Sequence, residues 1–296
     1  MKLGVDIGNY QVKTSEGIIF DSRVTNKVEF GSKAPKIEIN GSVYYLGEGT
    51  LEIEARKFDK ENFIPLLLGA ICESTNETTI DLAVGLPIIQ FKNKDLRLEL
   101  KSKIEDFNNI KVVYKGITRM INIRSLEVFP EGISGYLYAR KQGLLDEVGS
   151  RDAVLVDIGG KTTDISLVQK TTAKQSTSVN VGTIDIYYAI AEALKEKYYD
   201  ANIEVEKIQD YLDKGFYYKG EKQNIKFAID NSKYLFKKIY DELKINYPIN
   251  VEAVIIMGGG AKILGSAFRK NIPGLIILDE ERDIFANANG YKALIK

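Results

Sequence analysis

The tetrapeptide Val5-Asp6-Ile7-Gly8 occurs a second time as Val156-Asp157-Ile158-Gly159, about half a chain later. In each copy a short apolar run, typical of a buried strand, ends in an aspartate and a glycine turn. A return strand is expected after each copy, at residues 10–14 and 163–168. A strand–turn–strand unit repeated at this distance indicates internal duplication, because the repeats of a solenoid are far shorter. The sequence therefore predicts two related α/β domains that enclose one cleft.

The boundaries of the two domains follow from where the second copy begins. We expect domain I to span residues 1–148 and domain II to span residues 149–282. Weak alternation and turn residues predict a small, partly exposed β-rich insertion at about 24–62 in domain I. Hydrophobic patterning predicts helices at 63–72, 95–107, 184–198 and 226–245. It also predicts buried strands at 81–87 and 253–257.

Composition excludes several classes of function. The chain has no histidine and a single cysteine, Cys72, which excludes a zinc site of the usual kind and any catalytic triad built on histidine. Acid–base chemistry would then fall to a carboxylate, lysine or tyrosine. Lys+Arg and Asp+Glu balance at 41 each, so direct nucleic-acid binding is not expected. No apolar stretch approaches a membrane span of roughly 20 residues, and no signal peptide is evident, so we expect a cytoplasmic protein without a membrane partner.

The turn after the first repeated strand, Gly8-Asn9, suits phosphate binding. A glycine in a tight turn lets backbone N–H groups approach phosphate oxygens closely. Lys13 lies on the return strand, where its ammonium could reach the β- and γ-phosphates. Asp6 is placed to hold the shell of a Mg²⁺ ion through water, since magnesium gives up its waters reluctantly. A plain hairpin with a solvated lysine is the alternative interpretation of this segment.

The second copy continues as a longer polar turn, DIGGKTTD at residues 157–164. Its two glycines predict a second phosphate loop that faces the first. Thr162 offers a hydroxyl to a phosphate, while Asp157 and Asp164 could organise a metal ion and its waters. A polar hairpin turn is the alternative, but it leaves the repeated tetrapeptide unexplained.

Two further segments carry candidate chemistry. The Gly258-Gly259-Gly260 turn ends a buried strand and opens a helix, so it could lie flat against a ribose or adenine, with the helix N-terminus near the α-phosphate. Glu131, after Phe129-Pro130, could orient or deprotonate an attacking water; a surface turn residue is the alternative. Neither the Walker pattern nor G-x-G-x-x-G occurs, which disfavours P-loop and dinucleotide-binding folds.

Together these segments resemble the actin superfamily and, within it, the ParM-type plasmid-segregation actins. DIGGKTTDIS (157–166) looks like that group's second phosphate loop, and VIIMGGGA (254–261) looks like its adenosine loop. VFPE (128–131) is similar to the segment that carries the catalytic glutamate. FANANGY (285–291) resembles the closing helix, so a helix at about 283–296 is expected to pack back on domain I. The segments at about 24–62 and at 199–222 carry no recognisable motif.

The resemblance implies an α/β, actin-like (ribonuclease H-like) fold of two duplicated domains with an interdomain nucleotide cleft. The implied cofactors are ATP, with GTP as the alternative, and Mg²⁺. Asp6 and Asp157 would hold the metal through water, with Asp164 as a further candidate, and Glu131 would act on the attacking water. The implied nucleotide-binding residues are Gly8, Asn9, Lys13, Gly159, Gly160, Lys161, Thr162, Gly258, Gly259 and Gly260.

The function implied is that of an ATPase that polymerises into dynamic filaments on ATP binding and disassembles after hydrolysis. Such a protein would segregate plasmid DNA, with copies of itself and a DNA-binding adaptor protein as partners. Because the motifs report only on the cleft, two alternatives stay open. They are a small-molecule kinase of the sugar or acetate type and a monomeric nucleotide switch of the same superfamily.

Overall fold

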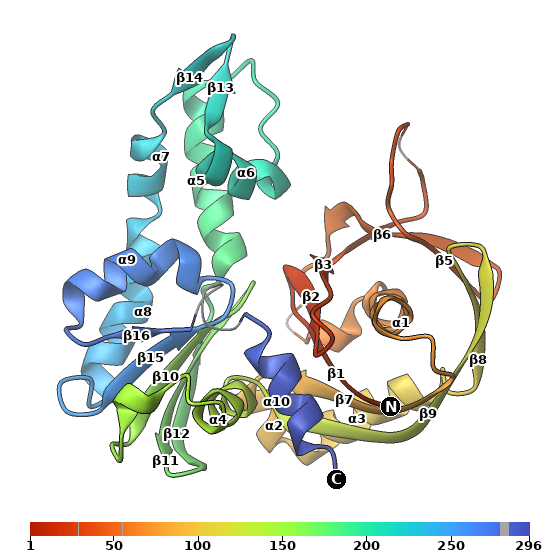
Figure 1. Cartoon of the computed structure of the whole chain (residues 1–296). Coiled ribbons are helices and arrows are strands. Elements are labelled where there is room, and N and C mark those ends of the chain that lie inside the picture. Colours follow the sequence, from red (N-terminus) through yellow and green to blue (C-terminus); the bar gives the residue numbers. More distant parts are fainter. Residues whose placement is uncertain (29, 55, 279–283) are drawn as a thin grey trace.

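The computed structural model describes residues 1–28, 30–54, 56–278 and 284–296. The chain folds into two α/β domains that lie side by side, each built on its own sheet (Figure 1). In the first, β1 (Lys2–Ile7) pairs antiparallel with β2 (Gln11–Thr14) and parallel with β7 (Thr79–Leu86).

The second sheet repeats this arrangement. Its strand β10 (Ala153–Ile158) pairs antiparallel with β11 (Thr163–Gln169) and parallel with β15 (Ala253–Met257). The two repeated tetrapeptides therefore end equivalent strands, and the predicted duplicated α/β fold is confirmed. The order of the sheet is β12-β11-β10-β15-β16, with β12 at Thr172–Val179 and β16 at Ile276–Ile277.

Nine strands form the first sheet, in the order β3-β2-β1-β7-β9-β8-β5-β6-β4. Its remaining strands are β3 (Ile19–Asp21), β4 (Arg23–Thr25), β5 (Lys36–Ile39), β6 (Ser42–Leu51), β8 (Ile110–Tyr114) and β9 (Ile117–Pro130). β3 and β4 lie at opposite ends of this order although only Ser22 separates them in the chain, so the sheet must curl back on itself. Figure 1 shows the curled sheet around helix α1.

The helix α1 (Phe63–Ser74) confirms the predicted helix at 63–72. Every residue from Phe63 to Cys72 is buried, because a helix that is apolar on all sides is stable only where protein surrounds it completely. The curled sheet provides that enclosure. Each fully buried leucine or isoleucine contributes about 1.5–3 kcal/mol to folding, so α1 is a main source of stability in this half.

The segment 24–62 is rich in strand, as predicted, but its strands continue the main sheet. β5 pairs with β8 as well as with β6, and the side chains of Ile37, Ile39 and Leu46 are buried in the core around α1. Residues 29 and 55 of this segment lie outside the described part of the chain. A short 3₁₀ turn, η1 (Lys57–Asp59), leads from the segment into α1.

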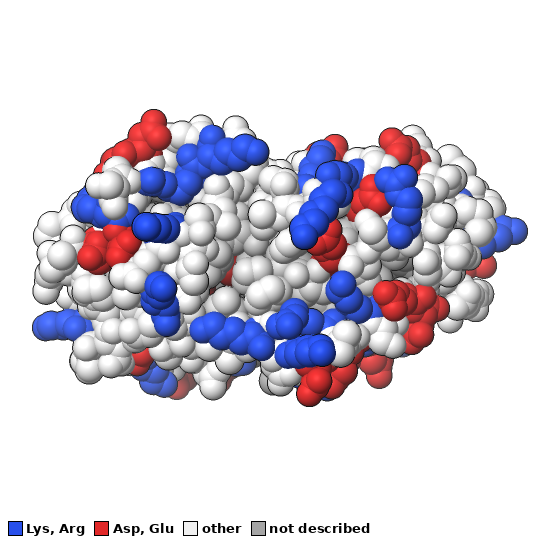
Figure 2. All heavy atoms as spheres, turned by 90° about the horizontal axis from the view of Figure 1, so that it is seen from below, with Lys and Arg blue, Asp and Glu red and all other residues white. Residues whose placement is uncertain are grey.

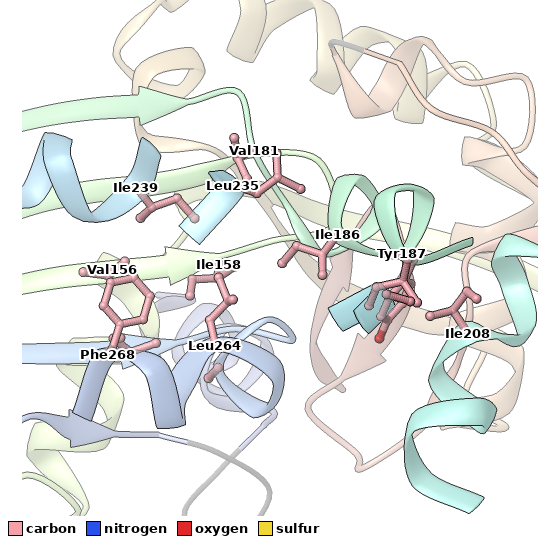
Figure 3. Packing of buried hydrophobic residues seen from close by; sticks show 14 of the residues in the cluster. Val156, Ile158, Val181, Ile186, Tyr187, Ile208, Leu235, Ile239, Leu264 and Phe268 are labelled. Atoms are coloured by element: carbon pink, nitrogen blue, oxygen red, sulfur yellow. The ribbon is translucent and has the colours of Figure 1, made fainter. Parts of the chain in front are cut away.

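Both faces of β10 are buried, against different partners. Val154, Val156 and Ile158 pack with α5 (Thr183–Lys197), α8 (Lys233–Asn246) and α9 (Ala261–Asn271). Figure 3 shows Val156 and Ile158 facing Phe268 and Leu264 of α9. The alternate residues Ala153 and Leu155 pack with α4 (Ile133–Lys141). Successive strand residues point to opposite faces, so the near-continuous apolar run is what a sheet covered on both faces requires.

The predicted helix at 226–245 is divided at Ser232 into α7 (Lys226–Asn231) and α8. The Ser232 hydroxyl donates a hydrogen bond to the Ile229 carbonyl oxygen (2.8 Å), and such local bonds from serine compete with the helical pattern. The predicted helix at 95–107 is α3 (Lys94–Glu105). The remaining elements are α2 (Ile88–Lys92), η2 (Asp146–Val148), η3 (Val205–Lys207), α6 (Ile208–Lys214), β13 (Phe216–Tyr218) and β14 (Glu221–Gln223).

The C-terminal helix α10 (Ala286–Leu294) returns to the first domain, where it contacts β1, β7 and α4. The expected start of this helix at about residue 283 lies outside the described residues. Figure 1 shows α4 and α10 between the two sheets. None of the described helices combines the length and the apolar character that crossing a membrane requires.

Candidate functional site

A cavity of about 470 Å³ lies between the two domains, at the ends of the repeated strands. Three turns converge on it: β1–β2, β10–β11 and β15–α9. All but one of the predicted site residues line the cavity, namely Asp6, Gly8, Asn9, Lys13, Glu131, Asp157, Gly159, Gly160, Lys161, Thr162, Asp164, Gly258 and Gly259. Gly260 is the exception: it is buried beside the site, where a Cβ atom would collide with the side chain of Ile158.

The two hairpin turns have the same geometry. The N–H of Gly8 donates to the carbonyl oxygen of Gln11 (3.0 Å), and the N–H of Gly159 donates to that of Thr162 (2.9 Å). The turns also approach each other closely, since a Cβ atom at Gly160 would lie 2.9 Å from the backbone nitrogen of Tyr10. Backbone of both domains therefore meets at the cavity, where the N–H groups of glycine-rich turns favour an anion.

The third turn requires its first glycine for two reasons. Gly258 has a φ of +85°, and a Cβ atom there would collide with the Oδ1 atom of Asp157 and lie 2.6 Å from the carbonyl oxygen of Ile158. A Cβ atom at Gly259 would meet no atom of the described residues within 4 Å. Gly258 thus packs against the end of β10, whereas Gly259 faces open space in the cavity.

Three of the carboxylates that line the cavity come from the ends of three strands: Asp6 in β1, Asp157 in β10 and Glu131 directly after β9. Lys57 of η1 joins two of them. Its ammonium hydrogen-bonds to the Oε1 atom of Glu131 and lies 3.6 Å from the Oδ1 atom of Asp6. Lys57 was not predicted, because it belongs to a segment without a recognisable motif and the signal of one lysine is weak.

Burial and charge oppose each other in this cluster. Burial raises the pKa of Glu131 above its ordinary value, and Asp6 adds to the effect, while the ammonium of Lys57 acts in the opposite direction without cancelling it. Burial lowers the pKa of Lys57, but Glu131 and Asp6 outweigh it and leave that pKa raised. The arrangement keeps a cation in place beside two largely buried carboxylates.

Asp157 is held by the C-terminal helix. The side-chain Nδ2 of Asn287 donates to its Oδ2 atom (3.1 Å), and the Oδ1 atom of Asn287 accepts from the backbone N–H of Gly132 (3.0 Å). Burial raises the pKa of Asp157, and the bond from Asn287 opposes this. Asn287 was predicted only as part of a family-like helix, and its side chain links that helix to both domains.

The two predicted lysines differ in their surroundings. Lys161 forms an ion pair with Asp185 at the start of α5 (2.7 Å). Its charge is therefore partly neutralised by a residue outside the β10–β11 turn. Lys13 lines the cavity opposite Asp6 in the β1–β2 ladder. The equivalent position of the second hairpin is Asp164, opposite Asp157, and burial raises the pKa of Asp164 to about 6.

The donor set fits a nucleotide that carries its own metal ion. In the described part of the chain, no group of three or more histidine, cysteine, aspartate or glutamate side chains is arranged to hold a metal ion by itself. Two buried acceptors at the cavity, Asn9 Oδ1 and Asp164 Oδ1, have no hydrogen-bond partner among the residues that the structure describes. Such atoms are costly unless a ligand, ion or water satisfies them. Magnesium held by phosphates and waters fits this geometry.

Comparison with known families defines the class. Residues 4–133 match the family described as "Actin like proteins N terminal domain", and residues 155–270 match "Archaeal actin homologue MreB-like, C-terminal". With the duplicated fold and the interdomain cleft, these matches show that the chain belongs to the actin-like superfamily.

Individual relatives agree with this class. The chain is 26% identical to archaeal actin homologs from Thermoplasma acidophilum and Thermoplasma volcanium, over 98% of its length and 97% of theirs. A crystal structure of an archaeal actin homolog in complex with ADP has a TM-score of 0.80 at 23% identity, covering 99% of this chain and 98% of that one. A 15-stranded ParM filament from Clostridium botulinum has a TM-score of 0.78 at 20% identity, covering 99% and 97%.

Proposed function

We propose that this chain is a Mg²⁺-dependent ATPase that assembles into filaments when it binds ATP and disassembles after hydrolysis. The observation that carries the proposal is the pair of equivalent glycine turns that meet at the cavity, which Glu131 also lines. A ligand with a chain of phosphates would contact both domains at once and hold them together. The ADP complex of a similar archaeal actin homolog supports a nucleotide as that ligand.

Each residue then has a defined task. The backbone N–H groups of the two hairpin turns and the ammonium of Lys13 bind the phosphates. Gly259 leaves room for the nucleoside at the third turn. Asp6 and Asp157, with Asp164 beside them, hold the water shell of Mg²⁺, which when bound neutralises charge on the phosphates.

Glu131 is the proposed catalytic residue. Its carboxylate orients the attacking water and accepts its proton, and the raised pKa that burial causes makes it a stronger base than an exposed glutamate. Once the proton has moved and phosphate is released, the contacts that joined both domains through the γ-phosphate are lost. The closed form is then less favoured, and contacts between neighbouring copies weaken.

Self-assembly is supported by the ParM filament among the structural neighbours. We propose head-to-tail contacts, which generate open strands rather than closed rings. Plasmid segregation is the proposed task, with DNA reached through a DNA-binding adaptor protein in the cytoplasm, where ATP is supplied. The even charge balance supports an adaptor, and Figure 2 shows basic side chains spread over both halves with acidic ones among them.

The first prediction concerns Glu131→Gln. We expect this variant to bind ATP and assemble like the wild type but to release phosphate about 10²–10⁴-fold more slowly, since the general base is lost. The measurement is phosphate release beside pelleting of the polymer, with Glu127→Gln on the same strand as the control. Normal phosphate release by Glu131→Gln would refute its role. Conversion of ATP to ADP without assembly, dependent on an added acceptor that becomes phosphorylated, would instead favour the small-molecule kinase.

A further inference from the structure

Lys57 is almost completely removed from solvent although it carries a charge. Its side chain is 7% exposed, and the carboxylates it contacts, Glu131 and Asp6, are 16% and 18% exposed. A buried ammonium is stable only where carboxylates or other acceptors surround it. Its three N–H donors allow it to bond to both carboxylates at once.

The cation in turn stabilises the two carboxylates. Glu131 and Asp6 come from different strands, and their like charges would repel each other because both side chains are largely buried. The ammonium hydrogen-bonds to the Glu131 carboxylate and lies 3.6 Å from the Oδ1 atom of Asp6, so its charge attracts both carboxylates and holds the glutamate side chain toward Asp6. Without it, the Glu131 carboxylate would gain by turning toward water, away from the phosphate turns.

The backbone around Lys57 is firmly anchored. The neighbouring Phe58 is buried in the core of the first domain (3% exposed). The ammonium of Lys103 in α3 donates to the carbonyl oxygen of Phe58, and Arg56 on the other side pairs with Asp59 and Glu99. Lys57 therefore projects into the cavity from a fixed turn, and its position is set by the β-rich segment and α3 rather than by the phosphate turns.

We propose that Lys57 is a positioning residue for the hydrolysis step: it holds the Glu131 carboxylate in the orientation from which it acts on the attacking water. This inference rests on the proposed ATPase function. Lys57 acts through Glu131 and is not required to bind the nucleotide. The segment 24–62, which lies outside the phosphate turns, thereby becomes part of the machinery that determines the rate of hydrolysis.

The test is a double-mutant cycle read by single-turnover hydrolysis of ATP. Lys57→Met is expected to lower the rate about 10- to 100-fold, as small displacements of catalytic groups do, and to change the Kd for ADP less than threefold. Lys57→Arg, which keeps a cation, should restore part of the rate. Lys36→Met makes the same chemical change at an exposed position of β5 and should leave the rate unchanged.

The decisive comparison is Lys57→Met/Glu131→Gln against Glu131→Gln alone, because a residue that acts only through another adds nothing once that other is removed. Equal rates of the two variants support the proposal. The comparison can be made even if Lys57→Met alone does not fold, because the double variant removes both buried charges and leaves neither without its partner. A double variant more than fivefold slower than Glu131→Gln, or a wild-type rate in Lys57→Met, overturns it. Absence of hydrolysis in the wild type would refute the ATPase function itself, and the inference with it.

Discussion

At the scale of single residues, the two halves carry opposite charges at one equivalent position of their hairpins. Asp6 and Asp157 end equivalent strands, and the residues opposite them in the ladders are Lys13 and Asp164. Duplication thus leaves a cation on one side of the cavity and a second carboxylate on the other. In the proposed function, the ammonium of Lys13 adds to the phosphate-binding N–H groups of both turns, and Asp164 adds to the carboxylates that hold the water shell of the metal ion.

The three glycines of the third turn allow a sharp prediction at this scale. Gly258→Ala is expected to destabilise the fold by about 1–3 kcal/mol, because alanine is strained at a positive φ and its methyl would collide with Asp157. Gly259→Ala should leave stability nearly unchanged, since its methyl meets nothing, but should weaken nucleotide binding by occupying the cavity. Thermal unfolding and ADP titration of both variants separate the two effects; equal stability of both would contradict this account of the turn.

The residues of the site fall into two groups by how well sequence could predict them. Aspartates and glycines of the three turns lie in short motifs next to apolar strands, so their convergence could be predicted and was found, apart from Gly260. Lys57 and Asn287 could not be predicted as site residues. Each comes from a separate segment and reaches the cavity only through tertiary packing, which leaves no local pattern.

At the scale of elements, α10 is the piece that connects the domains. It packs so closely that a Cβ atom at Gly4 would collide with the carbonyl oxygen of Ala288, and one at Gly290 with that of Ser134. The same helix carries Asn287, which bonds to Asp157 and to the backbone of Gly132. A shift of α10 therefore acts on the site as well as on the core.

Gly4→Ala tests this coupling. The added methyl must displace α10, and overpacking of this kind typically costs about 1–3 kcal/mol. We expect a lower Tm together with weaker binding of ADP, because Asn287 moves with the helix. Leu294→Ala, at a partly exposed position of α10 (36%), is the control and should change nucleotide binding little. If Gly4→Ala binds ADP with wild-type affinity, the position of α10 does not affect the site and the proposed coupling is wrong.

Element types were easier to predict than their assembly. The apolar run at 63–72 predicts a helix, and the structure shows why it can be apolar on all sides: a curled sheet surrounds it. The curl itself could not be predicted, because β4, β5 and β6 join the sheet only through β8, far away in sequence. The break at Ser232 was missed because the apolar pattern is helical on both sides of it.

At the scale of the whole molecule, the fold joins two similar domains that both contribute residues to the cavity between them. A nucleotide that contacts both hairpin turns would stabilise the arrangement in which the two domains are closed around it. The size of the effect is set by how much more tightly the nucleotide binds this closed arrangement than an open one. If copies of the chain associate best in the closed form, ATP binding and assembly are linked, and each must favour the other.

The measurement that tests this account most directly is light scattering, followed by sedimentation, of the purified protein with Mg²⁺ and either ATP, GTP, ADP or no nucleotide. The account predicts scattering that rises with ATP and decays as phosphate is released, with protein in the pellet at the peak and little assembly with ADP or without nucleotide. Protein that hydrolyses ATP but stays in the supernatant at concentrations well above the micromolar range, under all four conditions, would contradict it.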